Sequence, residues 1–337
     1  MKNYVKKVAM AMLLLAMANV CAARQWYVNN YMGIKADFAS IDAAMASEEV
    51  VEGDTIYIGA GCVLGSQTIS KKVTVIGTGW GYSDSPATVA KINGDVTITA
   101  QGTEVVGLYA SGKCNVNANN ITVQRCRFSS IGTNVSKIIS SVRIFSCYTG
   151  HIRAADMNRN GQGWEIKNNI INSDNQYSLA YLYNAAIENN IIRNTNTSTT
   201  SNYGVLFYDC QYGIVKNNVL ISISRNSNNS FYGCSNVTIE HNVMSMSTGF
   251  SDTNIMLGST ELSNIFNCTG SADSGEYYSL CEGSPAIGAG EGGNDCGVMA
   301  GAYKFVPYGR PDHIPVIKQL LVPDSPTNDQ INVTVGF

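Results

Sequence analysis

The segment IENNII, residues 187–192, decides the fold because close copies of it recur along the chain. Each copy has an apolar first residue and a Cys or Asn at its fourth position, and successive fourth positions lie 21, 22, 21, 28 and 24 residues apart. The copies are VQRCRF (123–128), IFSCYT (144–149), IKNNII (166–171), VKNNVL (215–220) and IEHNVM (239–244). Such a repeat, with strand-like spacing, predicts short strands stacked in parallel coils. We expect LSNIF (262–266) to continue the series with Asn264.

The paired asparagines have a physical reason in such a stack. Each coil must bend sharply between strands, and Asn tolerates the left-handed backbone conformation that a sharp bend requires. Coils stacked about 4.8 Å apart also place identical side chains above one another, so that a column of amides can hydrogen-bond along the stack. We therefore expect one Asn of each pair to turn the chain and the other to join a ladder. The sequence does not distinguish the two.

Composition supports a large, weakly charged domain. Of the 337 residues, 45% are hydrophobic and only 14% are charged, against roughly 25% charged in an ordinary globular domain. The formal net charge of −3 gives no signal for nucleic acid or for an anionic membrane surface, so we expect neither as a partner.

Residues 1–23 have the pattern of an export signal. MKNYVKK is a basic start, VAMAMLLLAMANV an apolar run, and CAA a small-residue cleavage site. Cys21 allows a lipoprotein alternative, but Val20 stands where such signals have a small side chain. With no second long apolar run, we expect no membrane span and a location in the periplasm, at the outer surface or outside the cell.

The sequence pattern of residues 24–53 predicts an N-terminal cap. In 37–47, Phe38, Ile41, Ala44 and Met45 have helical spacing, and Ser40 is a candidate N-cap. A helix there would cover the open edge of the first coil. Beyond it, DTIYIGAG (54–61), KVTVIGTG (72–79) and DVTITAQG (95–102) are alternating strands that end in Gly.

With these features the chain resembles exported, right-handed parallel β-helix proteins of the pectin-lyase-like type, as found in Bacteroides-like bacteria. The resemblance implies an all-β fold, with the β-helix over 54–303, a closing coil at GSPAIGAGEGGNDCGVMAGAY (283–303), and a C-terminal tail of extended, proline-rich strands over 304–337. It does not imply one reaction, because this scaffold carries lyases, hydrolases, esterases and binding proteins.

The sequence contains little recognisable catalytic chemistry. The paired-Asp and Gly-His-Gly motifs of polygalacturonases of this fold are missing, and the acidic residues between 160 and 260 do not cluster as calcium ligands. We expect no metal and no cofactor. Glu188 and Glu240 could form a catalytic pair, but Lys216 falls between them in the stack, so a surface charge ladder is the preferred interpretation.

One polar segment, GHIRAADMNRN (150–160), is a candidate active-site loop. It offers His151, Arg153 and Asp156 as weak catalytic candidates. The alternative is a polar excursion between two coils.

A candidate ligand-binding face follows from the tyrosines that precede the Asn bends. If Phe207 faces the core, Tyr208 faces outward and Tyr232 follows one coil later. We expect the remaining members of this face to be Arg153, Tyr181, Tyr183 and Asp209. In the resembled family this sheet face holds polysaccharide, and Tyr suits a sugar ring with an apolar face and polar edges. The alternative is that the tyrosines only cover a weakly charged surface.

Nine cysteines remain after cleavage of the export signal, an odd number. We expect Cys126, Cys147, Cys210 and Cys234 to be stacked core thiols, and if any disulfide forms, Cys281 and Cys296 are the expected pair. The resulting hypothesis is a surface or periplasmic protein that binds glycan or a partner without catalysis. The alternatives are a polysaccharide lyase or glycoside hydrolase, and a purely structural surface protein. The glycan and the oligomeric state stay open.

Overall fold

The computed structural model describes residues 23–81, 89–155, 160–198, 203–223, 230–245, 251–258, 261–270, 276–311, 319–321 and 334–336. Residues 1–22 of the predicted export signal, with Cys21, lie outside this part of the chain, and so does Asp156. In the described residues, none of the helices is long and apolar enough to cross a membrane.

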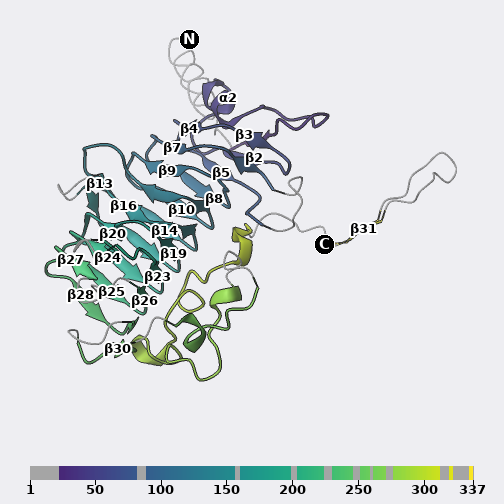
Figure 1. Cartoon of the computed structure of the whole chain (residues 1–337). Helices are drawn as coiled ribbons and strands as arrows, with labels where there is room; N and C mark the ends of the chain where they lie inside the picture. The colour runs from purple at the N-terminus through teal and green to yellow at the C-terminus, as the bar shows by residue number, and fades with distance from the viewer. Residues whose placement is uncertain are drawn as a thin grey trace, which may run out of the picture.

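Three long parallel sheets make up most of the structure (Figure 1). The ten-stranded sheet contains β1 (Gln25–Val28), β2 (Thr55–Ile58), β5 (Thr74–Ile76), β8 (Glu104–Val106), β10 (Thr122–Gln124), β14 (Arg143–Phe145), β18 (Glu165–Lys167), β22 (Ala186–Glu188), β25 (Ile214–Lys216) and β28 (Thr238–Glu240). The seven-stranded sheet contains β11 (Arg127–Phe128), β15 (Tyr148–Thr149), β19 (Ile170–Ser173), β23 (Ile191–Asn194), β26 (Val219–Ser222), β29 (Val243–Met244) and β30 (Ile255–Met256). The eight-stranded sheet contains β4 (Gln67–Ile69), β7 (Val96–Ile98), β9 (Lys113–Val116), β12 (Ser130–Gly132), β16 (Ile152–Arg153), β20 (Tyr177–Ala180), β24 (Val205–Tyr208) and β27 (Phe231–Tyr232).

Shorter pairings complete the strand inventory of the described residues. They are β13 (Ile139–Ser140), β17 (Gly161–Gln162) and β21 (Leu182–Tyr183) in one parallel sheet, β3 (Val63–Leu64) with β6 (Lys91–Ile92), and β31 (Gln319–Leu321) antiparallel to β32 (Thr334–Gly336). The last pair falls within the predicted tail, most of which lies outside the described residues. The chain visits the long sheets in turn, as from β14 to β15 to β16, and then returns to β18. This order is consistent with the predicted parallel β-helix.

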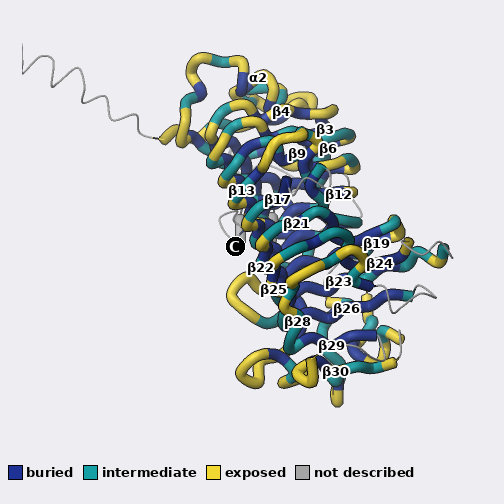
Figure 2. The backbone as a smooth tube through the Cα atoms, turned by 90° about the vertical axis from the view of Figure 1, so that its left-hand side faces the viewer, coloured by how far each residue is buried: buried dark blue, intermediate teal, exposed yellow. Residues whose placement is uncertain are grey.

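The first column of the repeat is a column of core residues. Ile144, Ile166, Ile187 and Val215 are partners in register on successive strands of the ten-stranded sheet, and none is more than 2% exposed. Burying each of these side chains contributes about 1.5–3 kcal/mol. Figure 2 shows the same pattern along the whole stack, with buried backbone inside and exposed turns outside.

The second Asn of each pair forms the ladder. Asn169, Asn190, Asn218 and Asn242 are all 0% exposed. Each amide Nδ2 donates to the Oδ1 of the next Asn, at 3.0 Å from Asn169 to Asn190, 3.0 Å from Asn190 to Asn218 and 2.9 Å from Asn218 to Asn242. The same Oδ1 atoms accept a backbone N–H, as Asn218 Oδ1 does from Asn190 at 2.8 Å. The buried amides are thereby hydrogen-bonded from both sides, as buried polar groups must be.

The ladder ends differently from the prediction. Its last rung is Asn254, whose Oδ1 accepts from Asn242 Nδ2 at 3.0 Å, and not Asn264, which lies in a 3₁₀ turn at Leu262–Asn264. The step from Asn242 to Asn254 is 12 residues, and β30 pairs with β29 in the same sheet. At the other end, Cys147 N donates to Asn169 Oδ1, so the cysteines extend the same column.

The first Asn of each pair turns the chain. Asn168, Asn189 and Asn217 have φ angles of 57°, 56° and 58°, in the left-handed region. The equivalent residues in neighbouring coils share this conformation, with φ between 52° and 58°: Arg125, Ser146 and His241. His241 therefore occupies the position of Asn in the bend.

Residues 276–311, here called the C-terminal strap, lie along the outside of the stack (Figure 1). Their apolar residues Ala286, Val298 and Phe305 pack in one buried cluster with Ile191 and Val219 of the seven-stranded sheet. Residues 283–303 contain turns and a 3₁₀ turn at Glu291–Gly293 but no strand. The prediction of a closing coil there is wrong, because these apolar side chains cover a sheet instead of stacking as another strand.

The strap binds to the left-handed residues of the bends. Polar atoms of this column bond to the strap at five positions. His241 O accepts from Cys296 Sγ (3.2 Å), and Asn217 Oδ1 accepts from Glu291 N (2.8 Å). Asn168 Nδ2 donates to Val298 O (3.0 Å), Ser146 Oγ donates to Lys304 O (3.0 Å), and Arg125 Nη1 donates to Arg310 O (3.2 Å). From Val298 to Arg310 the strap therefore runs antiparallel to the direction in which the coils are stacked.

At the N-terminal end, the predicted helix is present as α2 (Ile41–Ala46). Ser40 Oγ accepts from Ala43 N at 3.0 Å, so Ser40 is the N-cap. The helix is shorter than the predicted range, because Phe38 forms a β-bridge with Val28 and is extended. The range assigned to the cap also contains β1, which pairs with β2.

We predict that Asn190→Leu lowers the free energy of unfolding by about 2–4 kcal/mol, because it leaves several buried ladder partners without a hydrogen bond. Denaturant unfolding followed by tryptophan fluorescence measures the effect. Asn172→Leu is the matched control, since Asn172 is half-buried on β19 and accepts only a 3.5 Å bond from Arg193. Equal unfolding midpoints for the two variants would contradict the role of the ladder.

Candidate functional site

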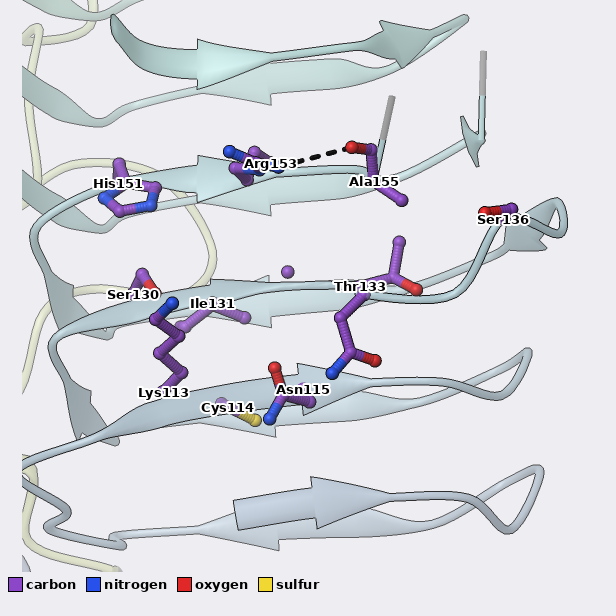
Figure 3. Close-up of a pocket in the computed structure, with 12 residues that line it drawn as sticks. Lys113, Cys114, Asn115, Ser130, Ile131, Thr133, Ser136, His151, Arg153 and Ala155 are labelled. Carbon is purple, nitrogen blue, oxygen red and sulfur yellow. Dashed lines mark hydrogen bonds between the residues drawn. The ribbon is translucent and has the colours of Figure 1, made fainter. Parts of the chain in front are cut away.

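The outer face of the eight-stranded sheet carries a pocket. It has a volume of about 320 Å³ and lies over β9, β12 and β16 (Figure 3). Its walls are polar and basic, and include Lys113, Asn115, Ser130, Thr133, His151 and Arg153. No carboxylate is among the described residues that line it.

The shape of this pocket depends on Gly132. The register places Asn115, Gly132 and Arg153 side by side on consecutive strands, in one outward column. Because Gly132 has no side chain, this column is interrupted between Asn115 and Arg153. A Cβ at Gly132 would collide with the carbonyl oxygen of Arg153, so only Gly fits there.

Arg153 connects the pocket to a neighbouring aromatic cluster. Its Nη1 donates to the Tyr177 hydroxyl at 2.7 Å, and its guanidinium carbon lies 5.9 Å from the centre of the Tyr177 ring. Its Nη2 donates to Ala155 O at 3.2 Å, as Figure 3 shows. Among the described residues no carboxylate pairs with Arg153, so its charge is available to an anion.

His151 is neutral in this setting. Burial and the positive charges of Arg153 and Lys113 together lower its pKa to about 4, against the opposite effect of Asp174. Its Nδ1 lies 3.2 Å from Asn175 Nδ2, and its ring is 6.5 Å from that of Tyr177. At neutral pH the ring is therefore a hydrogen-bonding group, and Lys113 and Arg153 supply the charge.

The aromatic cluster consists of Tyr177, Tyr181, Tyr208 and Tyr232. Tyr208 and Tyr232 are partners in register and stack nearly in parallel, with ring centres 5.5 Å apart. Tyr208 also contacts Tyr177 at 5.4 Å and Tyr181 at 5.7 Å. Burial raises the pKa of Tyr181 to about 12, so this hydroxyl keeps its proton. The structure thus brings together Arg153, Tyr181, Tyr208 and Tyr232 from the predicted face.

Tyr183 does not join this row, and its predicted place there is wrong. It lies in β21, where it pairs with Gln162 and forms a bridge with Gln211, and its ring packs against Tyr212 at 5.2 Å. The reason is the left-handed bend at Tyr181 (φ 62°), which turns the chain out of the eight-stranded sheet before Tyr183.

Asp209 occupies the same bend one coil later. Its φ is 49°, and the next coil has Gly233 with φ 68°. Burial raises the pKa of the Asp209 carboxyl. A Cβ at Gly233 would meet this carboxylate, so a side chain there would displace it.

Tyr177 belongs to the site but was not among the predicted residues. It is 8% exposed and clusters with Val205, its partner on β24. Simple alternation from Leu179, which faces the core, would also place Tyr177 inside. Tyr177 instead lies in the cluster with Val205, Tyr181 and Tyr208. On the neighbouring strand β24 the pairing with β27 has a local bulge, where Leu206 N and Phe207 N both donate to Ser230 O.

The other catalytic candidates are not assembled into a site. His151 and Arg153 share the pocket, whereas Asp156 lies outside the described residues. Glu188 and Glu240 are on the ten-stranded sheet on either side of Lys216, as predicted. Glu188 pairs with Lys167 at 3.4 Å, whereas Lys216 pairs with Glu291 of the strap at 2.7 Å.

In the described part of the chain, no group of three or more His, Cys, Asp or Glu side chains could hold a metal ion. All nine cysteines of this part are free thiols, including Cys281 and Cys296. Cys114, Cys126, Cys147 and Cys210 are buried, and Cys234 is partly exposed.

Comparison with known proteins adds no relative. No family model matches the chain, and no curated protein matches its sequence. The resemblance to pectin-lyase-like proteins therefore stays a prediction, and the site is interpreted from its geometry.

We predict that His151 titrates with a pKa of about 4, measured by NMR of its ring and assigned with His151→Gln. Because this value lies below the ordinary 6.5, the contribution of His151 to stability is complete above pH 6.5 and is lost as the pH falls toward 4. Arg153→Ala should raise the pKa, since it removes the largest charge effect. Lys216→Ala, on another sheet, should leave the pKa of His151 unchanged. Equal His151 pKa values in the wild type, Arg153→Ala and Lys216→Ala would contradict the described electrostatics.

Proposed function

We propose that the outer face of the eight-stranded sheet binds an acidic glycan without cleaving it. The observation that carries the proposal is the continuity of two unlike surfaces. A polar pocket with Lys113 and Arg153 adjoins a row of tyrosine rings, and Arg153 contacts both.

The two surfaces fit two parts of an acidic sugar chain. A carboxylate or sulfate group in the pocket would form charge-assisted hydrogen bonds with Arg153 and an ion pair with Lys113. Sugar rings would lie against Tyr208 and Tyr232, whose ring spacing of 5.5 Å is close to the length of one sugar residue. Because each ring contributes modestly, the affinity is weak and spread over several coils.

The residues that line the pocket favour binding of a glycan over its cleavage. Glycoside hydrolysis ordinarily uses two carboxyl groups about 5–10 Å apart, and the described lining residues include none. The basic residues there suit recognition of an anion, and no observation in the described residues favours a lyase or a hydrolase over binding.

The wider setting of the protein is also a proposal. We infer from residues 1–23 that the chain is exported, and from its repeats that it is a right-handed member of the pectin-lyase-like group. We further propose that α2 caps the stack. Its Asp42 carboxylate accepts from Thr68 N of the edge strand β4 at 2.7 Å, which occupies a backbone donor that would otherwise be open to another chain.

We predict that Tyr208→Ala and Tyr232→Ala each weaken glycan binding about three- to tenfold, since each removes one ring from the row. Titration calorimetry with polygalacturonate and chondroitin sulfate measures the effect, and circular dichroism checks that the fold is retained. Tyr183→Ala is the matched control, because Tyr183 lies beyond the bend in another sheet. If Tyr183→Ala reduces binding as much as the other two, the tyrosine row is not the binding surface.

A second prediction concerns charge. Arg153→Ala should abolish the preference for acidic over neutral glycans, because it removes the charge shared by the pocket and the rings. Arg127→Ala is the control, since Arg127 also lies over tyrosine rings, 5.4 Å from Tyr109 and 5.3 Å from Tyr148, but on the seven-stranded sheet. A panel that contains no glycan bound by the wild-type protein would refute the proposal outright.

A further inference from the structure

Cys210 and Cys234 lie opposite each other on adjacent coils, directly after the bend that ends the tyrosine row. The register pairs Tyr208 with Tyr232 and Gln211 with Ser235, and Ser235 N donates to Cys210 O at 3.1 Å. Parallel strands are about 4.8 Å apart, and disulfides span Cα separations of about 4.4–6.8 Å. The backbone therefore holds these two residues at a separation that a disulfide can bridge.

The two thiols occupy equivalent positions on neighbouring coils, and one of them is accessible. Cys210 Sγ donates to Tyr208 O at 3.5 Å, and Cys234 Sγ makes the equivalent bond to Tyr232 O at 3.7 Å. Cys210 is only 4% exposed, whereas Cys234, in the last coil of the eight-stranded sheet, is partly exposed. An oxidant can thus reach Cys234 first, while Cys210 is held beside it.

The pKa values of the two thiols also favour Cys234 as the one that reacts first. The neighbouring Cys210 thiol lowers the pKa of Cys234, against the opposing effect of burial. The neighbouring Cys234 thiol and burial raise the pKa of Cys210 well above its ordinary value. Cys234 is therefore the more acidic thiol of the pair, and thus the better suited to react first.

We propose that Cys210 and Cys234 are a site of oxidative modification, at which a small-molecule disulfide converts the two thiols to an intercoil disulfide. The Cys234 thiolate attacks one sulfur of the oxidant, so a protein–oxidant S–S bond forms, the oxidant's own S–S bond breaks and one thiolate leaves. Cys210 then loses its proton to solvent and attacks Cys234 Sγ, which releases the second thiolate. Two protein thiols are oxidised and one disulfide is reduced to two thiols.

The modification would act on the edge of the binding face. β27 has only two residues, Phe231 and Tyr232, and it is the last strand of its sheet in the described part of the chain. A bond between Cys210 and Cys234 ties this strand to β24, and so keeps Tyr232 stacked on Tyr208. The inference stands on the cysteine geometry and does not depend on the glycan proposal.

The test treats the folded, full-length protein with oxidised glutathione and maps its disulfides by proteolysis and mass spectrometry without reduction. We expect the loss of two free thiols and a single cross-link, between Cys210 and Cys234. In Cys210→Ser the reaction should stop at a glutathione adduct on Cys234, and in Cys234→Ser neither product should form at Cys210.

Cys126 and Cys147 provide a matched control within the same chain. They also face each other on adjacent coils, where Cys126 N donates to Cys147 Sγ at 3.4 Å, but both are 0% exposed. They should stay reduced. The proposal is overturned if Cys126 and Cys147 oxidise as fast as Cys210 and Cys234, or if the wild-type protein retains glutathione on Cys234 without forming the cross-link.

Discussion

The amide ladder is the constraint on which the rest of the structure depends. An Asn buried at 0% exposure is tolerated only if its amide donors and its oxygen are all satisfied. Asn190 meets this condition through the coils before and after it: Nδ2 donates to Ile166 O and to Asn218 Oδ1, and Oδ1 accepts from Asn169. A coil shifted by one residue would lose these bonds, so the ladder holds the coils from Asn169 to Asn254 in the same register. The outer columns, such as Tyr208 over Tyr232, are aligned as a consequence.

The two residues of each Asn pair have different roles. The second residue faces inward and holds the register, while the first turns the chain and offers its side chain to the strap. Asn168 illustrates this, since it adopts a φ of 57° and donates to Val298 O. The apolar residues of the strap then cover the central strands of the seven-stranded sheet, where Ile170, Ile191 and Val219 are buried. The pocket and the tyrosines lie on a different face, that of the eight-stranded sheet.

Much of this fold follows from the sequence, and the failures have a common cause. The column from Ile144 to Val215 and the position of the ladder were predicted because a repeat of about 22 residues is visible in the letters. Which Asn turns the chain was not predictable, since the two residues are chemically identical and differ only in backbone conformation. Asn264 was assigned to the ladder because the series was expected to continue at its regular step. The chain instead makes a 12-residue step to Asn254, within one sheet.

Local backbone conformation also decided which site residues could be predicted. Alternation along a strand holds for Tyr208 and Tyr232, which lie inside β24 and β27, and their outward stacking followed from it. It fails for Tyr183, because a left-handed residue intervenes and turns the strand direction, and it does not account for Tyr177, whose ring lies with Tyr208 outside the main core. A period of two is thus informative only between consecutive bends. Asn, Asp and Gly are the residue types that ordinarily mark such bends. Because Tyr181 occupies the same position, the bend there could not be recognised from the sequence.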